Sequence, residues 1–169
     1  RKIDVGKIND RYFINRVSGG FGANVNDKVS QESKAVLGKL AYYMEGALDF
    51  SKKGMETVRI RLDSKQFQGE RDVLSFIVLN TCAGFGIYQG MPDKDMQDGV
   101  LDVLIVKKMA LGQVSTLGLR ALTRKMTNHP KVKHFQTKRI RIESASKEDV
   151  SVDFDGQTFG NLPIDLSIV

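Results

Sequence analysis

Short stretches in which apolar and polar residues alternate recur along this chain, and they constrain its fold more than any other feature. The alternation has the period of two that a β-strand with one buried face shows. Two further stretches are almost continuously apolar, as expected for strands covered on both faces. The sequence therefore predicts a chain built mainly of β-strands. The alternating stretches are 57–62 (TVRIRL), 138–144 (KRIRIES), 150–154 (VSVDF) and 163–169 (PIDLSIV), and the continuous ones are 73–80 (VLSFIVLN) and 100–106 (VLDVLIV).

Two longer segments have the apolar spacing of amphipathic helices. The first runs from Ser30, which can serve as an N-cap, to Phe50, and the second runs from Met109 to a stop at Asn128 and Pro130. At 169 residues the chain has the size of one domain. Many short strands with only two helices predict a mainly β domain over residues 1–169, a two-layer β-sandwich with helical insertions.

Composition excludes several classes of protein. With 41% hydrophobic and 27% charged residues, the chain is expected to fold and not to be intrinsically disordered. No run approaches the roughly 18 apolar residues that cross a bilayer, and the first ten residues contain no apolar signal core. One cysteine, Cys82, and two histidines, His129 and His134, provide neither an internal disulfide nor a Cys/His zinc set. We therefore expect a cytoplasmic protein.

A basic segment, residues 107–141, contributes much of the net charge of +6, because it contains no acidic residue. Such a segment can attract an anionic membrane surface, a phosphate-bearing ligand or nucleic acid, or it can be a solvated basic face. Nucleic acid is the weakest of these alternatives, because Phe135 is the only aromatic residue among the charges and cannot by itself form a stacking platform.

Two glycine-rich stretches, 18–24 (SGGFGAN) and 82–90 (CAGFGIYQG), could let backbone amides approach a phosphate or a lipid headgroup. Neither has the Gly-Lys-Ser/Thr ending of a P-loop, and neither begins a βαβ unit. Tight turns or bulges are the simpler interpretation.

Aspartates cluster around Gly99 in the stretch 91–106 (MPDKDMQDGVLDVLIV). Closely spaced carboxylates and turn carbonyls suit a hard cation such as Mg²⁺. The stretch is not an EF-hand loop, because it lacks the ligand register and the final glutamate of that motif. A polar turn without a metal ion is the alternative interpretation. The four aspartates are Asp93, Asp95, Asp98 and Asp102.

The stretch 152–160 (VDFDGQTFG) combines a strand with a turn. Alternation predicts that Asp153 and Asp155 leave the core together. The pair Asp155-Gly156 is also a strong signal for a type I′ hairpin turn. A carboxylate at the rim of a sheet can act as a general base for a hydroxyl group, whereas the amide of Gln157 cannot accept a proton at neutral pH. The residues alone leave open whether this is only a turn or part of a catalytic site.

The order of these motifs resembles the C-terminal domain of soluble bacterial diacylglycerol kinases, in a superfamily that includes sphingosine and ceramide kinases. The resemblance covers nearly the whole chain. Its most specific part is the block 80–106, in which Pro92, Asp98-Gly99 and Leu101-Asp102 follow in family-like order. The other stretches that carry it are 3–25 (IDVGKINDRYFINRVSGGFGANV), 37–48 (LGKLAYYMEGAL) and 152–160 (VDFDGQTFG).

The resemblance implies the second domain of a two-domain enzyme that transfers the γ-phosphoryl group of ATP to a lipid hydroxyl. The family's nucleotide-binding domain, with its Gly-Gly-Asp-Gly-Thr motif, is expected before this chain and is absent from it. The family's Asp-Gly-Glu segment corresponds to Asp155, Gly156 and Gln157. The resemblance therefore implies that Asp155 is the general base for the acceptor hydroxyl and that Gln157 orients the hydroxyl or a water molecule.

The family's structural Mg²⁺ site carries over to the carboxylate of Asp98, with backbone carbonyls near Asp95 and Val100. Two residues depart from the family pattern, since Gln157 replaces a glutamate and Gly22 stands where the family has an aspartate. The implied acceptor is diacylglycerol, with a sphingoid base or a polyprenol left open. The alternative is a non-catalytic lipid-binding or regulatory module, which the two departures favour.

Several partners follow from the same resemblance. ATP is the expected phosphoryl donor and Mg²⁺ the expected cofactor, with ATP bound mainly by the N-terminal domain. The protein is expected to act at the inner face of the membrane as a peripheral, cytoplasmic enzyme, held to anionic headgroups by the segment 107–141. An exposed sandwich edge could support a homodimer, and no nucleic-acid partner is expected.

Overall fold

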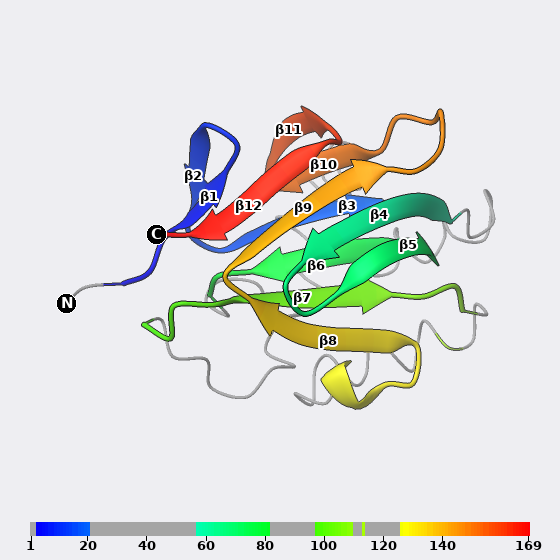
Figure 1. Ribbon diagram of the computed structural model, residues 1–169, viewed down its shortest axis with the longest axis horizontal. Helices are drawn as coiled ribbons and strands as arrows, with labels where there is room; N and C mark the ends of the chain where they lie inside the picture. Colours follow the sequence, from blue (N-terminus) through cyan, green and yellow to red (C-terminus); the bar gives the residue numbers. More distant parts are fainter. Residues whose placement is uncertain (1–2, 21–56, 82–96, 110–112, 114–125) are drawn as a thin grey trace, which may run out of the picture.

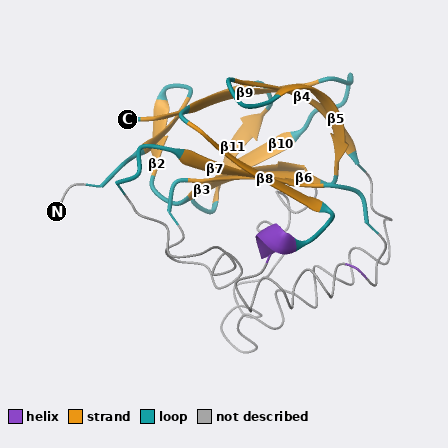
Figure 2. Cartoon of the chain, turned by 60° about the horizontal axis from the view of Figure 1, so that its bottom comes forward, coloured by secondary structure: helices purple, strands orange, loops and turns teal. Residues whose placement is uncertain are grey.

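The computed structural model describes residues 3–20, 57–81, 97–109, 113 and 126–169 of the chain. Within these residues the protein forms two six-stranded antiparallel sheets that pack as two layers (Figures 1 and 2). The predicted mainly β sandwich is therefore confirmed. No helix among the described residues is long and apolar enough to cross a membrane.

Sheet A has the strand order β2-β1-β12-β9-β4-β5. The C-terminal strand β12 lies between β1 and β9 (Figure 1). The first and last described residues therefore meet in this sheet, where the amide of Val5 donates to the carbonyl of Val169 at 3.1 Å. The strands of sheet A are β1 (Gly6–Ile8), β2 (Arg11–Phe13), β4 (Val58–Ser64), β5 (Gln68–Val73), β9 (Arg139–Ser144) and β12 (Ile164–Ile168).

Sheet B has the strand order β11-β10-β3-β6-β7-β8. Two of its interior strands, β6 and β7, correspond to the two continuously apolar stretches of the sequence. The strands of sheet B are β3 (Arg16–Gly20), β6 (Ser75–Leu79), β7 (Leu101–Val106), β8 (Val132–Thr137), β10 (Ser151–Phe154) and β11 (Gln157–Asn161).

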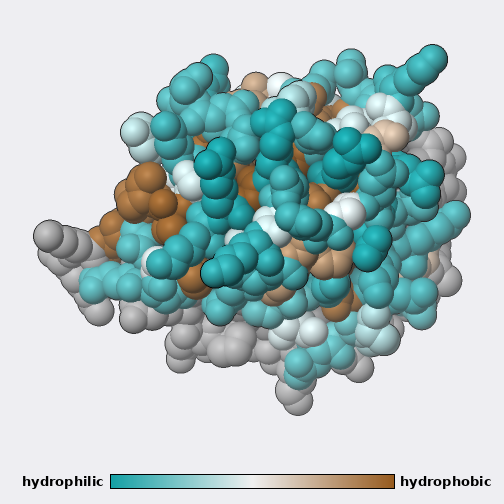
Figure 3. Space-filling view, in the orientation of Figure 1, coloured by the Kyte–Doolittle hydropathy of each residue, from teal (hydrophilic) through white to brown (hydrophobic). Residues whose placement is uncertain are grey.

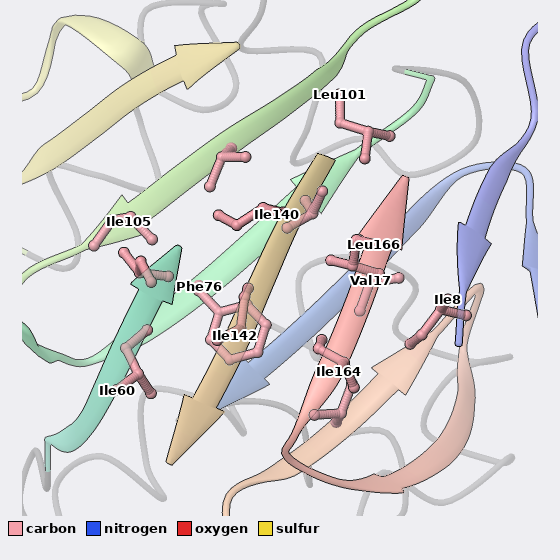
Figure 4. Close-up of a cluster of buried hydrophobic side chains, with 14 of the residues drawn as sticks. Ile8, Val17, Ile60, Phe76, Leu101, Ile105, Ile140, Ile142, Ile164 and Leu166 are labelled. Atoms are coloured by element: carbon pink, nitrogen blue, oxygen red, sulfur yellow. The ribbon is translucent and has the colours of Figure 1, made fainter. Parts of the chain in front are cut away.

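One hydrophobic core lies between the two sheets (Figure 4). Inner-face side chains of sheet A meet those of sheet B there, and most of them are completely buried. Burial of this kind stabilises a fold by about 1.5–3 kcal/mol for each large aliphatic or aromatic side chain. The contributing residues include Ile60, Ile140, Ile142, Ile164 and Leu166 from sheet A, and Val17, Phe76, Leu101, Val103 and Ile105 from sheet B.

The structure contains all six predicted strands and adds β1, β2, β3, β5, β8 and β11. Strands β2, β5, β8 and β11 are the edges of the two sheets. An edge strand pairs on one side only and is largely exposed, so its sequence can be polar and lacks a clear alternation. β5, with the sequence QGERDV and five of six residues not buried, is the clearest case.

The predicted helical insertions stay predictions. The segment 30–50 lies outside the described residues, and so does most of 109–130. At the end of the second segment, Met126–Asn128 form a short 3-10 helix, η2 (Figure 2). Its position agrees with the predicted stop, since His129 and Pro130 follow as a turn.

The outer face of sheet A carries a chain of ion pairs across four strands, which we call the charged ladder: Asp165, Arg141, Glu143, Arg61 and Glu70. Arg141 contacts both Asp165 and Glu143, and the second of these pairs is 2.7 Å long. Arg61 continues the chain to Glu143 at 3.9 Å and to Glu70 at 2.7 Å. The ladder is exposed to solvent, so its ion pairs are screened by water and contribute little to the stability of the fold.

The outer face of sheet B is buried on the interior strands β3, β6 and β7 and at Asp153 of β10, in contrast to that of sheet A. All six side chains of β7 are buried, including Asp102, whose residue is 1% exposed. Asp153 on β10 is 3% exposed. The prediction that 150–154 has one buried face, so that Asp153 and Asp155 leave the core together, is therefore wrong for Asp153. Alternation places Asp153 outside the inner core, but the outer face does not reach water at this position.

Candidate functional site

A two-residue turn between β10 and β11 carries the residues predicted to be catalytic. Asp155 and Gly156 have φ angles of 47° and 84°, and Phe154 lies opposite Gln157 in the ladder. Positive φ at both central positions is the mark of a type I′ turn, which Asp-Gly favours. The predicted hairpin turn is therefore confirmed. Gln157 begins the edge strand β11, and its side chain is exposed.

The carboxylate of Asp155 binds the backbone that leads into β3. Its Oδ2 accepts a hydrogen bond from the amide of Ile14 at 2.7 Å, and its Oδ1 accepts from the amides of Asn15 and Arg16, both at 2.8 Å. The amide of Asp155 in turn donates to the carbonyl of Arg16 at 2.9 Å. Asp155 thus fastens the hairpin to a segment about 140 residues earlier in the chain, and this structural role was not visible in the sequence.

The second predicted site residue, Asp98, lies in the turn before β7. Its Oδ1 accepts from the amide of Val100 at 3.1 Å, the local bond that aspartate often makes in turns. Gly99 has a φ angle of 65°, and its amide donates to Oδ2 of Asp4 at 2.6 Å. Asp4 therefore ties the Asp98 turn to the N-terminal segment. Asp98 itself is exposed.

Asn80 connects the two turns. Its side-chain amide donates to the carbonyl of Asp4 and to the carbonyl of Ile14, both at 2.9 Å. Asp4 holds the Asp98 turn, and the amide of Ile14 binds Asp155. We call this set the two-turn network: Asp4, Ile14, Asn80, Asp98–Gly99 and Asp155. Asn80 is 1% exposed, so its bonds are made in a protected environment, where an unmade hydrogen bond is costly.

The structure thus brings together the two groups that the sequence analysis proposed separately. Asp4 and Asn80 lie within stretches that carry the resemblance, but sequence reasoning gave neither a role. A buried asparagine directly after an apolar strand was the signal that could have identified Asn80, because a buried amide needs partners. Asp4 had no comparable signal, since its partners come from distant parts of the chain.

Asp153 belongs to a different, buried cluster. Its Oδ1 accepts a short hydrogen bond from the hydroxyl of Ser18, and its Oδ2 lies 3.7 Å from the guanidinium of Arg16. On the same outer face of sheet B, the Nε2 atom of His134 lies 2.6 Å from Oδ1 of Asp102. The alternation of the sequence suggested a solvent-facing Asp153, whereas the structure uses it to pair a buried arginine.

Other predicted residues lie outside the described part of the chain. These are Asp93, Asp95, Gly22 and Cys82, together with residues 82–90 of the second glycine-rich stretch. Of the first glycine-rich stretch, residues 18–20 are described and form the end of β3.

The described residues contain no group of three or more His, Cys, Asp or Glu side chains that could hold a metal ion. A cation at the Asp98 turn would therefore need backbone carbonyls or water in addition to the Asp98 carboxylate. These are the oxygen ligands that Mg²⁺ accepts, so the donor chemistry of the turn fits that ion.

Apolar side chains are exposed near the two-turn network. Among the described residues, the exposed large hydrophobic side chains are Ile3, Tyr12, Ile14 and Val169, with exposed fractions from 42% to 64%. Ile14 adjoins Asp155 directly through its amide. Figure 3 shows hydrophobic surface at the left end of the molecule, where Figure 1 places β1, β2 and the C-terminus. The rest of that face is mainly hydrophilic.

Fold and site together define the class: an antiparallel β-sandwich domain in which two turns, at Asp98-Gly99 and Asp155-Gly156, are joined by long-range hydrogen bonds. The chain belongs to the family of YegS C-terminal NAD kinase beta sandwich-like domains, whose model matches residues 15–169. The chain is 34% identical over 162 residues to a protein named diacylglycerol kinase from Staphylococcus epidermidis (strain ATCC 35984), and 33% identical to one of the same name from Staphylococcus aureus (strain bovine RF122).

Both matches cover 96% of this chain and 50% of the relative, so the chain spans about half the length of the curated relatives it matches. Among solved structures, one crystal structure from Bacillus anthracis str. Sterne matches all of this chain with a TM-score of 0.76 and 25% identity, over 54% of its own length. Another, of a diacylglycerol kinase from the same organism, matches with a TM-score of 0.70 and 24% identity. The second likeness supports the fold alone.

Proposed function

We propose that this chain is the lipid-acceptor domain of an ATP- and Mg²⁺-dependent lipid kinase that converts diacylglycerol to phosphatidate. One observation carries the proposal: the Asp98 and Asp155 turns are joined by the two-turn network, in a chain that resembles proteins named diacylglycerol kinase over 96% of its length. A sphingoid base or a polyprenol is an alternative acceptor with the same kind of hydroxyl group.

Asp155 is the proposed general base. The hydroxyl oxygen of the lipid attacks the γ-phosphorus of ATP, the bond from that phosphorus to the oxygen bridging to the β-phosphate breaks, and ADP leaves. The hydroxyl proton passes to the Asp155 carboxylate. A carboxylate has about four lone-pair positions, and three backbone amides use Asp155 as their acceptor. About one position is left for the hydroxyl, whose orientation the fixed carboxylate would then define.

Gln157 is proposed to orient the acceptor hydroxyl or a water molecule. It is exposed and follows the turn directly, and its amide can both donate and accept a hydrogen bond. It cannot replace a carboxylate as a base. Because general-base catalysis typically contributes about 10²- to 10⁴-fold, the loss of one acid of a pair would slow the reaction. Phosphoryl transfer rests mainly on positioning and charge neutralisation, so activity is still expected.

The carboxylate of Asp98, with the backbone carbonyls near Asp95 and Val100, is proposed to hold a structural Mg²⁺ ion. When bound, the ion would neutralise negative charge at the turn. ATP is proposed to bind mainly to an N-terminal domain in the full-length protein, which would correspond to the half of the relatives that this chain does not match.

The exposed apolar side chains beside Asp155 support a lipid acceptor, because a soluble sugar or nucleoside would not need them. We propose a cytoplasmic enzyme that binds the inner face of the membrane peripherally. Within the basic segment 107–141, Arg139 and Arg141 both contact Asp165. The proposed attraction to anionic headgroups would therefore come mainly from the other basic residues of the segment. A homodimer through an edge strand is a further proposal, and no nucleic-acid partner is proposed.

A non-catalytic lipid-binding module is the second candidate. It is favoured by Gln157 in place of a glutamate and by the three backbone amides that bind Asp155, because both observations are compatible with a turn that has only a structural role. The two candidates differ in whether phosphate is transferred.

The test is phosphate transfer from ATP to diacylglycerol in mixed micelles with Mg²⁺, using the full-length gene product. Asp155→Ala is expected to lower the rate about 10²- to 10⁴-fold, and Gln157→Glu is expected to retain or raise it. Asp63→Ala, which removes an exposed carboxylate from sheet A, is the matched control. Thermal unfolding of each variant separates lost catalysis from lost folding.

If the parent protein is inactive and Gln157→Glu restores turnover, the natural protein is a lipid-binding relative that has given up catalysis. A folded Asp155→Ala variant with full activity would exclude Asp155 as the base.

A further inference from the structure

The sandwich has two lateral margins, at each of which the edge strand of one sheet approaches that of the other. Strands β5 and β8 are the edges at one margin, and β2 and β11 are the edges at the other (Figure 1). A cation lies over an aromatic ring at both margins. At the β2/β11 margin this is a single pair among the described residues, in which Arg11 lies 5.6 Å from the ring centre of Phe159. The β5/β8 margin is different.

Two cations from different sheets converge on one ring at the β5/β8 margin. The Nζ atom of Lys133, on β8, lies 3.8 Å from the centre of the Phe67 ring, and Cζ of Arg71, on β5, lies 4.9 Å from the same centre. Phe135, also on β8, stacks on Phe67 with ring centres 5.7 Å apart. We call these four residues the margin cluster. Their contacts bring together residues from both sheets.

The strand register explains why the two cations meet. Arg71 lies opposite Ile60, and Lys133 lies opposite Ile105. Both partners are core residues, so both cations occupy inner-face positions at the last strand of their sheets. Long basic side chains in such positions cover apolar surface with their methylene groups and extend their charge to solvent. Both Arg71 and Lys133 are indeed exposed.

Carboxylates on β5 are directed to other partners. Glu70 and Asp72, the neighbours of Arg71 in the chain, pair with Arg61 and Arg59 on β4. Arg71 donates instead to the backbone carbonyl of Glu70 at 2.6 Å. Within the part of the chain that the structure describes, neither Arg71 nor Lys133 forms an ion pair with a carboxylate. Two positive charges therefore contact the ring of Phe67, and neither is neutralised by a carboxylate of the described residues.

We propose that Arg71 and Lys133 form a binding site for a phosphate group. A guanidinium can bind two phosphate oxygens at once, and an ammonium adds a compact second charge. The aromatic pair restricts both cations before an anion arrives, which lowers the entropy lost on binding. The ligand chemistry is a phosphate monoester or diester, supplied either by the headgroup of an anionic lipid or by a soluble phosphate compound.

The site goes beyond the proposed kinase activity. The catalytic turn joins β10 to β11 and so lies at the opposite margin of sheet B from β8. Loss of the phosphate site is therefore expected to leave phosphate transfer in neutral mixed micelles unchanged, and an inactive protein could still bind phosphate at Arg71 and Lys133. Binding of a lipid headgroup at this site rests on the proposed membrane association, whereas binding of a soluble phosphate compound does not.

The experiment compares the full-length gene product with Arg71→Gln/Lys133→Gln. One arm measures binding of glycerol 3-phosphate by calorimetry, and the other measures sedimentation with phosphatidylcholine vesicles that contain or lack phosphatidylglycerol. Arg11→Gln/Lys147→Gln is the matched control, since it removes the same charge, from one arginine and one lysine that are exposed and lie outside the segment 107–141. Arg71→Lys/Lys133→Arg keeps both charges. Far-ultraviolet circular dichroism verifies that each variant is folded.

We expect the parent to bind in at least one arm, and the binding to weaken as salt is raised. The Gln variant is expected to lose about fivefold for each charge removed, and to lose more than the control, while the charge-keeping variant retains most of the affinity. A loss limited to vesicles identifies a lipid headgroup, and a loss with glycerol 3-phosphate identifies a soluble phosphate. Absence of binding by the parent in both arms, or equal losses in the Gln variant and the control, would overturn the proposal.

Discussion

The two sheets of the sandwich carry their charged residues in opposite ways. On sheet A the charged ladder lies on an exposed face, where Arg61, Arg141 and their partners contact water as well as each other. On the interior strands of sheet B the corresponding face is buried and holds Asp153 with Arg16. Alternation in the sequence identifies both sets as outward-facing. Only the structure shows which outward face reaches solvent, and this decides what each charge contributes.

The electrostatics of sheet A follow from its exposed ion pairs. The hydrogen bond from Arg61 is the main cause that lowers the pKa of Glu70 below its ordinary value, and the bond to Glu70 raises the pKa of Arg61. The pKa of Arg141 is raised by its hydrogen bond to Glu143 and then by the charge of Asp165. Water screens such interactions, so large shifts in stability are not expected from them.

Removing Asp153 is expected to have the largest effect on stability. Asp153→Ala leaves the buried guanidinium of Arg16 without this carboxylate and the hydroxyl of Ser18 without this acceptor. The expected loss is about 3–5 kcal/mol of unfolding free energy, as for breaking a buried ion pair from one side. Asp63→Ala on the exposed face of sheet A is the matched control, and it is expected to cost much less. Denaturant unfolding of both variants measures the two losses of unfolding free energy. Equal losses would contradict the difference between the two outer faces.

Asp155→Ala is expected to be the next most destabilising change. Three backbone amides lose their acceptor, and at about 1 kcal/mol for each hydrogen bond the expected cost is about 3 kcal/mol. Hydrogen exchange should show the reason locally, because the amides of Ile14, Asn15 and Arg16 should exchange faster than in the parent. Unchanged protection of these three amides would show that Asp155 does not hold the segment.

The inner faces of the two sheets are expected to behave alike, because they share one core. A Cβ atom on Gly19 of sheet B would lie 2.4 Å from Cζ of Phe76, and one on Gly6 of sheet A would lie 2.2 Å from Cζ of Phe13. Both rings are buried and cannot move aside without repacking. Gly19→Ala and Gly6→Ala should each cost about 1–3 kcal/mol. A cost confined to one sheet, measured by thermal unfolding, would show that the difference between the sheets extends into the core.

The smallest effect is expected for Glu70→Gln in the charged ladder. At neutral pH the unfolding midpoint should stay close to that of the parent. The folded-state pKa of Glu70 is depressed, so its contribution is present above the ordinary value near 4.5 and is lost as the pH falls through the folded-state value. The parent should therefore lose slightly more stability than the variant on acidification below about pH 4.5. Thermal unfolding between pH 7 and pH 3 measures this, and a large loss for the variant at pH 7 would contradict the view that the ladder is screened.

Much of the fold was predictable because it rests on local pattern. The stretches 57–62 and 138–144 form β4 and β9, with their arginines on the outer face. A strand with one buried face leaves an alternation of apolar and polar residues that is visible in the sequence. The edge strands β5 and β8 were not predicted. Their side chains are not required to be apolar, and they become strands by pairing with β4 and β7.

The candidate site was predictable in part. The type I′ turn at Asp155-Gly156 follows from the two residues themselves, which tolerate positive φ. The partners of the Asp155 carboxylate could not be predicted, because they are backbone amides whose position depends on where β3 begins in the folded chain. The same holds for Asn80, whose amide joins segments that are far apart in sequence.

By itself, the sequence determined which residues alternate and which pair makes the tight turn, because these depend on neighbours within a few positions. The order of its motifs also determined which family the chain resembles. The tertiary structure alone decided that Asp153 is buried, that Asp98 and Asp155 belong to one network, and that Arg71 meets Lys133 on Phe67. The physical reason is that solvent exposure and long-range hydrogen bonds arise only when strands distant in sequence are packed side by side.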